Sequence, residues 1–422
     1  MASLDHPNII RLFETYEDEL YLHLVLELCT GGDVCERIIE RGNFNEKKAA
    51  NLMKQLLNAV NYLHINNITH RDLKAENFLY VDNETDDLKI CDFGMSIRNN
   101  RNKMKSIAGT PYYLAPEVFK GPYTKACDVW SLGVFMYFIL TGRHPFKGTN
   151  LESIYEKSSQ GIVSINQDNI SALSPLGREF LRRMLEIKPS KRISLKEALS
   201  HPWVQGSSES ITRIPEMVFK SLQKYKAKNK LWQEAIKIVV KTLSNTQINS
   251  LRQAFISLDT TNSGFITAID LQESMKTHGF NLALEEIEGI IKNCSYIESG
   301  KINYTEFLVA TLNKKALLNE EVMWEAFKIF DKKNQGKINV KELSLALKEA
   351  GCEFSNEEFQ ELIAEAKLDE NSDIDFENFK IIMNCFEEEE EQLNMNRRAS
   401  LMRRMSRDIR GALDFAKTNI KS

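Results

Sequence analysis

One short run of polar residues in this sequence could carry out phosphoryl transfer. His70-Arg71-Asp72-Leu73-Lys74-Ala75-Glu76-Asn77 is followed, fifteen residues after Asn77, by Asp92-Phe93-Gly94. Transfer of a phosphoryl group needs alignment and charge neutralisation rather than covalent help from the protein. Asp72 would accept or orient the proton of a substrate hydroxyl, and Lys74 would reach the γ-phosphate. Asn77 and Asp92 would hold Mg²⁺ against the phosphates.

Two neighbouring stretches must position these side chains. The predicted strand Leu88-Lys89-Ile90-Cys91 leads into Asp92 and fixes its place. A further motif, Gly109-Thr110-Pro111-Tyr112-Tyr113-Leu114-Ala115-Pro116-Glu117, closes the region. The tripeptide Asp-Phe-Gly alone recurs by chance, whereas the three motifs in this order are too long to be accidental.

Residues 1–204 resemble a eukaryotic Ser/Thr protein kinase of the calmodulin-dependent group. Three later stretches, Asp128–Val134, Gly142–Phe146 and His201–Trp203, also fit that family, and Lys74 marks Ser/Thr rather than Tyr specificity. The resemblance implies an α+β, protein-kinase-like fold. Residues 1–28 would be a remnant of the N-lobe sheet with the hinge, and residues 29–204 a mostly helical C-lobe. Strands are expected at 9–13 and 21–26, and helices at 44–64 and 129–140.

The resemblance implies roles for further residues. Glu27-Leu28-Cys29 would be the hinge that hydrogen-bonds adenine, with Leu26 as gatekeeper, while Asp33 and Glu76 would face ribose and basic substrate residues. Glu117 would pair with Arg192 in a buried ion pair that anchors the activation segment, and Asp128 would brace the catalytic loop. The residues expected to bind the nucleotide are Glu27, Cys29, Asp33 and Leu79, with ATP and Mg²⁺ as cofactors.

Residues 215–243 have the pattern of a basic amphipathic helix. Apolar residues recur there at helical spacing, and seven lysines oppose two glutamates. Such a helix is typical of a calmodulin target or a membrane surface, although a solvated linker helix would have the same pattern. From about residue 247 the sequence repeats four times at a spacing of about 36 residues, with loops centred on Ile266, Ile302, Ile338 and Ile374.

With these additions the whole chain resembles the calcium-dependent protein kinases of plants and protists. The resemblance implies an autoinhibitory junction helix at 205–246 and an all-α, calmodulin-like EF-hand domain, with hand pairs at 247–313 and 314–386. A charged tail would follow at 387–422. In that family the junction helix occupies the substrate groove at rest, and calcium-loaded hands pull it away. The junction helix and the EF-hand lobe are therefore expected to be intramolecular partners.

The predicted calcium loops depart from the EF-hand pattern, which supplies oxygen at positions 1, 3, 5, 7, 9 and 12. We expect weak binding in the first loop, 259–270, through Asp259, Thr261, Ser263, the Phe265 carbonyl and Asp270. The third loop, 331–342, offers Asp331, Gln335, the Lys337 carbonyl and Glu342, but Lys333 puts an ammonium at position 3. That ammonium would repel a dication unless it swings out of the loop.

The second and fourth loops are more strongly eroded. The second, 295–306, has Glu306 as its only carboxylate at a ligand position, and the fourth, 367–378, begins with Lys367 and ends with Asn378. Calcium is therefore expected only at degenerate sites. One alternative is that the first and third loops keep some affinity, and the other is a calcium-insensitive lobe held in one state.

The front of the sequence also departs from the kinase pattern. A glycine-rich loop, a Val-Ala-Ile-Lys lysine and a helix glutamate would precede the turn Asp5-His6-Pro7-Asn8-Ile9, so the chain is expected to open inside that helix. Either the sequence is a fragment of an active kinase, which the retained Asp72 and Lys74 favour, or it is a natural short form without catalysis. The second alternative would be a binding module rather than an enzyme.

Composition limits the remaining possibilities. A net charge of −4, 42% hydrophobic residues and no long apolar run predict a globular protein with no nucleic-acid partner and no membrane segment. Seven scattered cysteines without a C-x-x-C pair fit a reducing compartment, so we expect a cytoplasmic monomer. Its substrates would be proteins with basic residues before Ser or Thr. Ser400 and Ser406 follow arginines at that spacing and are candidate phosphosites, or incidental serines of a solvated tail.

Overall fold

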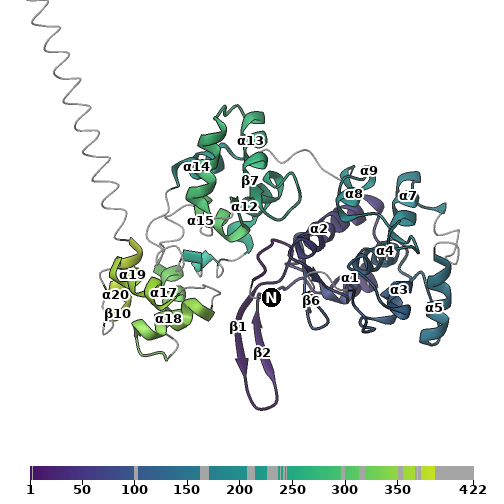
Figure 1. The fold of residues 1–422 in the computed structure, drawn as a ribbon, viewed down its shortest axis with the longest axis horizontal. Helices are drawn as coiled ribbons and strands as arrows, with labels where there is room; N and C mark the ends of the chain where they lie inside the picture. Colours follow the sequence, from purple (N-terminus) through teal and green to yellow (C-terminus); the bar gives the residue numbers. More distant parts are fainter. Residues whose placement is uncertain are drawn as a thin grey trace, which may run out of the picture. The chain divides into compact units, whose positions relative to one another are not determined.

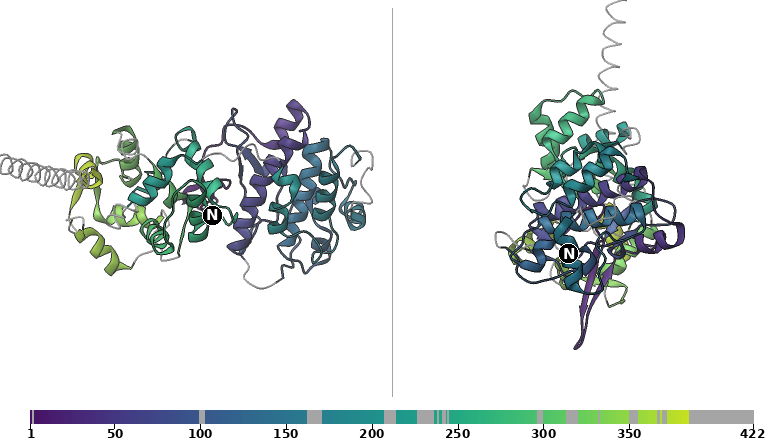
Figure 2. Two further views of the ribbon diagram at one scale, coloured as in Figure 1. Left: turned by 90° about the horizontal axis from the view of Figure 1, so that it is seen from above. Right: turned by 90° about the vertical axis from the view of Figure 1, so that its right-hand side faces the viewer.

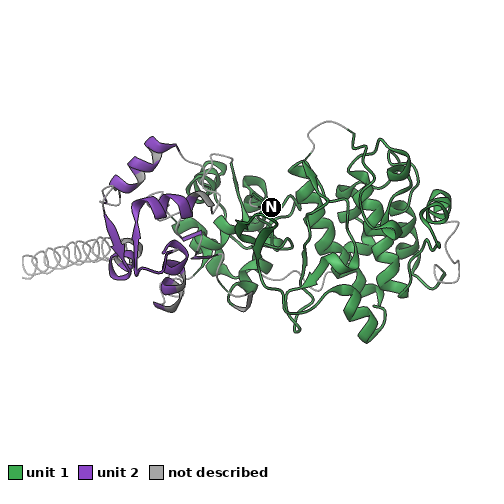
Figure 3. Cartoon of the chain, turned by 90° about the horizontal axis from the view of Figure 1, so that it is seen from below, with its two compact units in different colours: residues 1–226, 243–312 green, residues 227–242, 313–422 purple. Residues whose placement is uncertain are grey.

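The structure is a computed structural model in which the chain forms two compact units (Figure 3). It describes residues 1, 3–98, 103–161, 171–206, 214–225, 236–237, 239–240, 243, 245–295, 300–312, 320–331, 333–349, 355–365, 368 and 372–384. The first unit holds residues 1–226 and 243–312, and the second holds residues 227–242 and 313–422. The predicted tail with Ser400 and Ser406, half of the predicted junction and parts of the second and fourth loops lie outside the described residues.

The first unit begins with a two-stranded antiparallel sheet. Strands β1 (Leu12–Glu17) and β2 (Leu22–Leu26) form the hairpin labelled in Figure 1. Several of its apolar side chains are exposed, among them Leu22, Leu24 and Val25. The predicted first strand starts too early, because Ile9 forms a parallel bridge with Ile90 and Ile10 donates its N–H to the Ile90 carbonyl instead. Both isoleucines are thereby buried in the lobe.

Helices make up most of the rest of the kinase-like region (Figure 1, Figure 2). They are α1 (Val34–Arg41), α2 (Glu46–Ile65), α3 (Pro116–Lys120), α4 (Ala126–Thr141), α5 (Leu151–Gln160), α7 (Pro175–Met184), α8 (Leu195–Leu199) and α9 (Pro202–Gln205). The core lies between α2 and α4, and α4 is buried from Cys127 to Leu140, as its continuous apolar sequence predicts. Gly133 allows close packing there, since a Cβ would lie 2.9 Å from Met184 and Leu185.

Two small antiparallel ladders carry the polar motifs. Strand β4 (Phe78–Tyr80) pairs with β5 (Leu88–Ile90), and β3 (Ile68–Thr69) pairs with β6 (Ile97–Arg98). Short 3₁₀ turns, η1 (Ala75–Asn77) and η2 (Pro111–Tyr113), precede β4 and α3 respectively. Together with the helices these strands form an α+β fold, as the resemblance implies, and a helical region follows it.

The four predicted repeats fold as two pairs of hands. The first pair contains α12 (Asn245–Leu258), β7 (Ile266–Thr267), α13 (Ala268–Thr277), α14 (Leu284–Cys294), β8 (Lys301–Ile302) and α15 (Tyr304–Thr311). The second contains α17 (Glu320–Phe330), β9 (Lys337–Asn339), α18 (Val340–Glu349), α19 (Asn356–Glu365), β10 (Asp373–Asp375) and α20 (Phe376–Asn384). Ile266 pairs with Ile302, and Ile338 with Ile374, so the isoleucine at the centre of each predicted loop pairs with that of its neighbour.

The first part of the predicted junction is helix α10 (Glu216–Lys224). It packs against α14 and α15 of the first pair, and Phe219 is fully buried beside the rings of His278 and Phe280. Later junction residues Ile236, Val239 and Val240 are buried in the second unit. The junction is therefore shared between the two units rather than belonging to one.

Candidate active site

The β4–β5 hairpin places the two predicted magnesium ligands at the same end of the ladder. Phe78 pairs with Ile90, so Asn77 immediately precedes one strand and Asp92 closely follows the other. The Cys91 N–H donates to the Asn77 carbonyl over 2.9 Å and ties the two ends together. Asn77 donates its amide nitrogen to the Asp72 carbonyl over 2.8 Å, which leaves its amide oxygen for a cation. This donor set fits Mg²⁺, which binds carboxylate and amide oxygens.

Asp72 lies at the centre of the site and is held by two neighbours. Its carboxylate accepts the Thr110 N–H (2.8 Å) and hydroxyl (2.7 Å) and forms an ion pair of 2.9 Å with Lys74. Lys74 in turn donates to the Thr110 hydroxyl over 3.0 Å. The three residues form a closed ring of hydrogen bonds, so the carboxylate and the ammonium have fixed positions.

The ring keeps both charged groups ionised at neutral pH. Burial alone would raise the pKa of Asp72, but the hydrogen bonds from Thr110 and Lys74 outweigh it and leave the pKa below its ordinary value. Burial would lower the pKa of Lys74, yet its hydrogen bond to Asp72 and the nearby carboxylates raise it. An ionised Asp72 can accept a proton, and an ionised Lys74 can neutralise phosphate charge.

The backbone of this loop is strained and is held in place from behind. Arg71 and Asp92 have φ angles of 71° and 56°, a region that side chains other than glycine seldom adopt. Asp128 stabilises the loop, because its carboxylate accepts the N–H groups of His70 (3.0 Å) and Arg71 (2.9 Å) and contacts the His64 ring. Gly109 makes room for the turn, since a Cβ there would lie 2.4 Å from the Arg71 carbonyl oxygen.

Two contributors were not found by sequence reasoning. Thr110 belongs to the motif at 109–117, but the motif does not reveal that the Thr110 hydroxyl joins Asp72 to Lys74. The buried His70 ring packs 4.9 Å from the Phe93 ring and contacts the Cys91 carbonyl, so it positions the residues on either side of Asp92. No spacing rule predicts such contacts, because both depend on how distant loops meet.

Three of the residues expected to bind the nucleotide, Glu27, Asp33 and Leu79, belong to the β4–β5 ladder or contact it. Asp33 and Leu79 form an antiparallel bridge, and Asp33 caps α1 by accepting the Glu36 N–H over 2.8 Å. Burial raises the pKa of the Cys91 thiol to about 12. The Glu27 carboxylate forms a buried ion pair of 2.9 Å with Lys89, and its N–H donates to the Arg11 carbonyl, so the Glu27 carbonyl is left for a ligand.

The predicted pair that anchors the activation segment is present. Arg192 donates to both carboxylate oxygens of Glu117, at 2.6 and 2.9 Å, and its guanidinium lies over the Trp130 ring. The Arg192 side chain is fully buried. A buried pair of this kind fixes the segment that carries Thr110 relative to the helices below it.

The first calcium loop brings all of its predicted ligands together. The Asp259 carboxylate accepts the Ser263 and Gly264 N–H groups, Ser263 donates to the Phe265 carbonyl, and the Asp270 carboxylate accepts the Thr260 and Thr267 hydroxyls. Thr261 reaches both carboxylates. Burial and the charge of Asp270 raise the pKa of Asp259 to about 6. Two close, buried carboxylates with hydroxyl and carbonyl oxygens fit a cation.

This loop also lies against the kinase-like lobe within the first unit. Asn61 of α2 donates to the Asn262 carbonyl over 2.7 Å, and the Tyr62 ring lies 5.4 Å from the Phe265 ring. Gly264 allows the approach, since a Cβ there would lie 2.4 Å from the Tyr62 ring. A buried ion pair of 2.5 Å joins Asp87 to Arg252 of α12. We call these contacts the docking surface.

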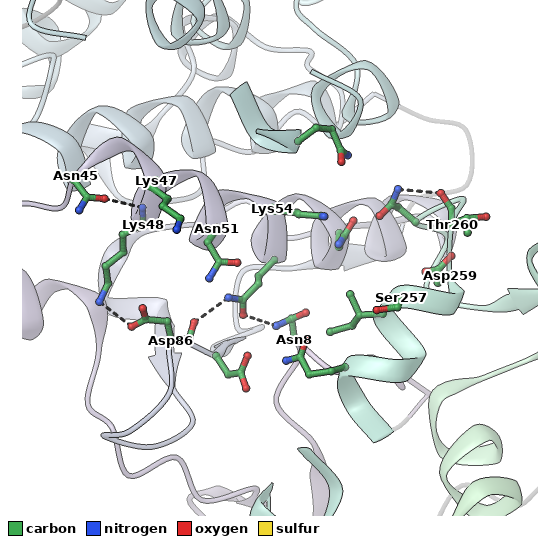
Figure 4. A pocket seen from close by; sticks show the side chains of 17 residues that line it. Asn8, Asn45, Lys47, Lys48, Asn51, Lys54, Asp86, Ser257, Asp259 and Thr260 are labelled. Carbon is green, nitrogen blue, oxygen red and sulfur yellow. Dashed lines mark hydrogen bonds and ion pairs between the residues drawn. The ribbon is translucent and has the colours of Figure 1, made fainter. Parts of the chain in front are cut away.

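Asp5 extends the docking surface to the second hand. Its carboxylate accepts the N–H (2.8 Å) and hydroxyl (2.9 Å) of Thr305 at the start of α15, and its own N–H donates to the Tyr62 hydroxyl. Beside these contacts is a polar cleft of about 780 Å³ (Figure 4). Figure 4 shows Lys48 directed toward Asp86, while Asp259 and Thr260 of the first loop line another part of the cleft. The docking surface is therefore more polar than a protein core.

The third loop does not provide a comparable site. Its Lys333 ammonium forms an ion pair of 2.8 Å with Glu342 across the loop, while most of the lysine side chain is exposed to solvent. This bond lowers the pKa of Glu342. Lys337 pairs with Asp373, and Gln335 contributes its N–H to Asp331. Among the described residues, those of the first loop included, no group of three His, Cys, Asp or Glu side chains could hold a metal ion, so the first loop offers two carboxylates with hydroxyl and carbonyl oxygens. The second and fourth loops lie partly outside the described residues.

Comparison with known proteins places this geometry in context. The protein kinase domain family matches residues 1–204, and the EF-hand domain pair family matches residues 320–384. Calcium-dependent protein kinase 21 of Arabidopsis thaliana is 35% identical over 379 residues, which cover 89% of this chain and 71% of that protein. Calcium-dependent protein kinase 29 of the same plant is 38% identical with the same coverage. Calcium-dependent protein kinase 3 of Plasmodium yoelii yoelii is 38% identical over 350 residues, 82% of this chain and 65% of that protein.

Proposed function

Because this chain belongs to the calcium-dependent protein kinase family, we propose that phosphoryl transfer takes place at Asp72. By family the chain is a Ser/Thr protein kinase with a C-terminal EF-hand region. Asp72 accepts the proton of the substrate hydroxyl. Lys74 neutralises charge on the γ-phosphate as the hydroxyl oxygen bonds to its phosphorus and the bond from that phosphorus to the bridging oxygen of the leaving ADP breaks. Bound Mg²⁺ would neutralise the remaining phosphate charge, and Asn77 and Asp92 would hold it.

The ring formed by Asp72, Lys74 and Thr110 is the observation that carries this proposal. A base that is already oriented and ionised loses little free energy on reaching the reactive geometry, and alignment of this kind supplies much of the rate in phosphoryl transfer. The amide orientation of Asn77 supports the metal assignment, because its nitrogen is already used. The backbone of Glu27 and Cys29, with Asp33 and Leu79, would accommodate the nucleotide.

Replacement of the base tests the proposal. Phosphate transfer from radiolabelled ATP to a peptide with Arg three residues before Ser is measured for the parent chain, Asp72→Asn and Asp86→Asn. Asp86 is a matched control, since its carboxylate pairs with Lys48 on the surface. We expect Asp72→Asn to remove transfer and Asp86→Asn to retain it. Transfer by Asp72→Asn at the parent rate would exclude the assignment.

We also propose a preference for basic substrates, because the negatively charged Glu76 lies beside the site. Glu76 is exposed and directly precedes Asn77, so its carboxylate faces solvent where a peptide would lie. Replacing the peptide arginine with alanine should lower transfer in the parent chain and should matter less in Glu76→Gln. Equal effects in both chains would remove Glu76 from substrate recognition.

Regulation is proposed to depend on the first calcium loop, with Asp259, Thr261, Ser263, Phe265 and Asp270 as its ligands. Among the described loops, this is the one in which the predicted ligand oxygens lie close together. It also forms part of the docking surface on the lobe that carries Asp72. We further propose a cytoplasmic monomer. Free cysteines such as Cys29, Cys127 and Cys294 support a reducing compartment, and among the described residues no helix has the length and apolar character needed to cross a bilayer.

A further inference from the structure

The third loop has the backbone of a calcium loop. Asp331 at its first position accepts the N–H groups of Gln335 (2.9 Å) and Gly336 (2.7 Å), and Asn334 and Gly336 have φ angles of 52° and 73°. The first loop has the same arrangement, in which Asp259 accepts from Ser263 and Gly264 and the corresponding φ angles are 52° and 78°. The backbone therefore gives no reason for the third loop to exclude calcium.

The side chains of the third loop are arranged differently. Oε1 of Glu342, the last position, forms an ion pair of 2.8 Å with the Lys333 ammonium, while Oε2 accepts the Asn339 N–H over 3.2 Å, as Asp270 accepts the Thr267 N–H in the first loop. In a loaded hand this carboxylate would give both oxygens to calcium, and the third position would give an oxygen rather than an ammonium. Calcium consequently does not fit the loop in this arrangement.

Lys333 also supplies the positive charge that a calcium ion would otherwise supply. Asp331 and Glu342 are both largely buried, and two carboxylates in one loop repel each other unless a cation lies near. Lys333 is covalently attached to the same loop, so its ammonium is present at a high effective concentration whatever the calcium level. A calcium ion would have to displace it and would then be repelled by it.

The neighbouring loop has the same chemistry. Lys337 forms an ion pair of 2.5 Å with Asp373 across the β9–β10 ladder, and Lys380 contacts Glu377 and Glu320. The buried pair Ile338 and Ile374 joins the loops beneath these contacts. Four acidic residues of the second pair, Glu320, Glu342, Asp373 and Glu377, are thus each paired with a lysine of the same pair.

We propose that Lys333 is a built-in cation that takes the place of Ca²⁺ in the third hand, so that this hand keeps one conformation at all physiological calcium concentrations. The inference deepens the proposed regulation, and it rests on that proposal only in assigning calcium sensing to the first loop. The consequence is that the two pairs of hands have different tasks. The first pair responds to calcium, and the second is a permanent structural partner for the junction residues buried in its unit.

The test uses the full chain, freed of metal, and titrates it with calcium chloride. Heat is measured by calorimetry, and the Gly336 amide resonance is followed by NMR with glycine labelled in nitrogen-15. Lys333→Asn removes the ammonium and adds an oxygen at the third position, whereas Lys333→Met only removes the ammonium. Lys337→Met is the matched control, since it removes an ammonium of the same loop that pairs with Asp373 instead.

In the parent and in Lys337→Met, the Gly336 resonance should stay in place up to roughly millimolar calcium. Lys333→Asn should bind one more calcium ion per chain, with affinity at least about tenfold above the parent, and Lys333→Met should gain less. If Lys333→Asn does not fold, as judged by circular dichroism, Lys333→Met carries the same comparison.

Movement of Gly336 at micromolar calcium in the parent would overturn the inference. So would folded Lys333 variants that bind calcium no better than the parent. Failure of the proposed catalytic function would be distinguishable from failure of this inference, because calcium titration does not depend on phosphate transfer. The Asp72→Asn chain can be titrated in the same way.

Discussion

Asp72 shows how single contacts determine what the site can do. Its carboxylate is kept ionised by Thr110 and Lys74 against the effect of burial, and its backbone neighbours are held by Asp128. The residue types and spacing could be predicted from the sequence, because Asp72, Lys74, Asn77 and Asp92 belong to local motifs. The ring through Thr110 could not, since it joins loops 36 to 38 positions apart through one hydroxyl.

Removal of that hydroxyl should slow phosphate transfer. In Thr110→Ala, Asp72 and Lys74 lose their shared partner, and misplacement of catalytic groups costs roughly a hundredfold at most in such sites. We expect kcat to fall by about ten to a hundred times, with a smaller change in KM for ATP. Thr110→Ser keeps the hydroxyl and should stay near the parent rate. Equal rates for Thr110→Ala and the parent would show that the ring has no catalytic role.

The buried pair between Arg192 and Glu117 should contribute strongly to stability. Arg192→Met leaves the Glu117 carboxylate without its partner, which costs about 3–5 kcal/mol for buried pairs. Arg183→Met is the control, because Arg183 pairs with Glu179 and Glu197 on the surface and should cost less than about 1 kcal/mol. Urea unfolding of the kinase lobe measures both. Similar losses in the two variants would contradict the assignment of a buried, structural pair.

At the scale of elements, the turn from Asp5 to Asn8 is a contact point between the kinase lobe and the first pair of hands. His6 lies in it against Tyr62, and its ring nitrogen accepts the Asn8 N–H over 3.0 Å. Burial, with the charges of Lys89 and Arg252, lowers the pKa of His6 to about 3. The imidazole is therefore neutral in the folded protein, and protonation would remove its acceptor.

Stability of the first unit should consequently fall in mild acid. The unfolded histidine has a pKa near 6.5 and the folded one about 3, so this contribution is complete above pH 6.5 and is lost as the pH falls below it. The loss is at most about 1.4 kcal/mol for each pH unit. His6→Asn keeps an acceptor in the turn without titrating, and its urea midpoint should depend less on pH between 6.5 and 5. The same pH dependence in both chains would exclude His6 as the cause.

The elements themselves were largely predictable, and their partners were not. The helix at 44–64 follows from apolar periodicity and the helix at 129–140 from a continuous apolar run, whereas the repeat locates the loop isoleucines without showing which of them pair. The strand at 9–13 was misplaced because Ile9 and Ile10 pair with Ile90, and an apolar run does not reveal which strand it will join. The docking surface uses Asn61, Tyr62 and Asp87, which belong to no motif.

At the scale of the whole molecule, the two pairs of hands belong to different units. The first pair is grouped with the kinase lobe and α10, and the second with later junction residues (Figure 3). The repeat in the sequence is uniform and gives no sign of this division. It arises from contacts that only the first pair makes within its unit, through Arg252, Asn262 and Thr305.

Calcium removal should therefore affect the two pairs unequally. A ligand stabilises only the state that binds it. Among the described loops, the first is the one in which the predicted calcium-binding oxygens lie close together. In hydrogen exchange of the full chain, addition of a chelator should speed exchange in 245–277 and leave 333–349 nearly unchanged. An Asp259→Asn chain is the control and should show little response to the chelator. Equal acceleration of both segments in the parent would contradict this division of tasks.

The contact between Asp5 and Thr305 has a consequence for exchanging parts between kinases. Asp5 of the kinase lobe accepts the N–H and the hydroxyl of Thr305 in the first turn of α15, beside the capping residue Asn303, so the first pair of hands is not a detachable cassette. A chimera that imports a foreign EF-hand region would leave Asp5, Asn61 and Asp87 facing side chains for which they are not matched. Transplantation should succeed only when these three residues are exchanged together with the hands that they hold.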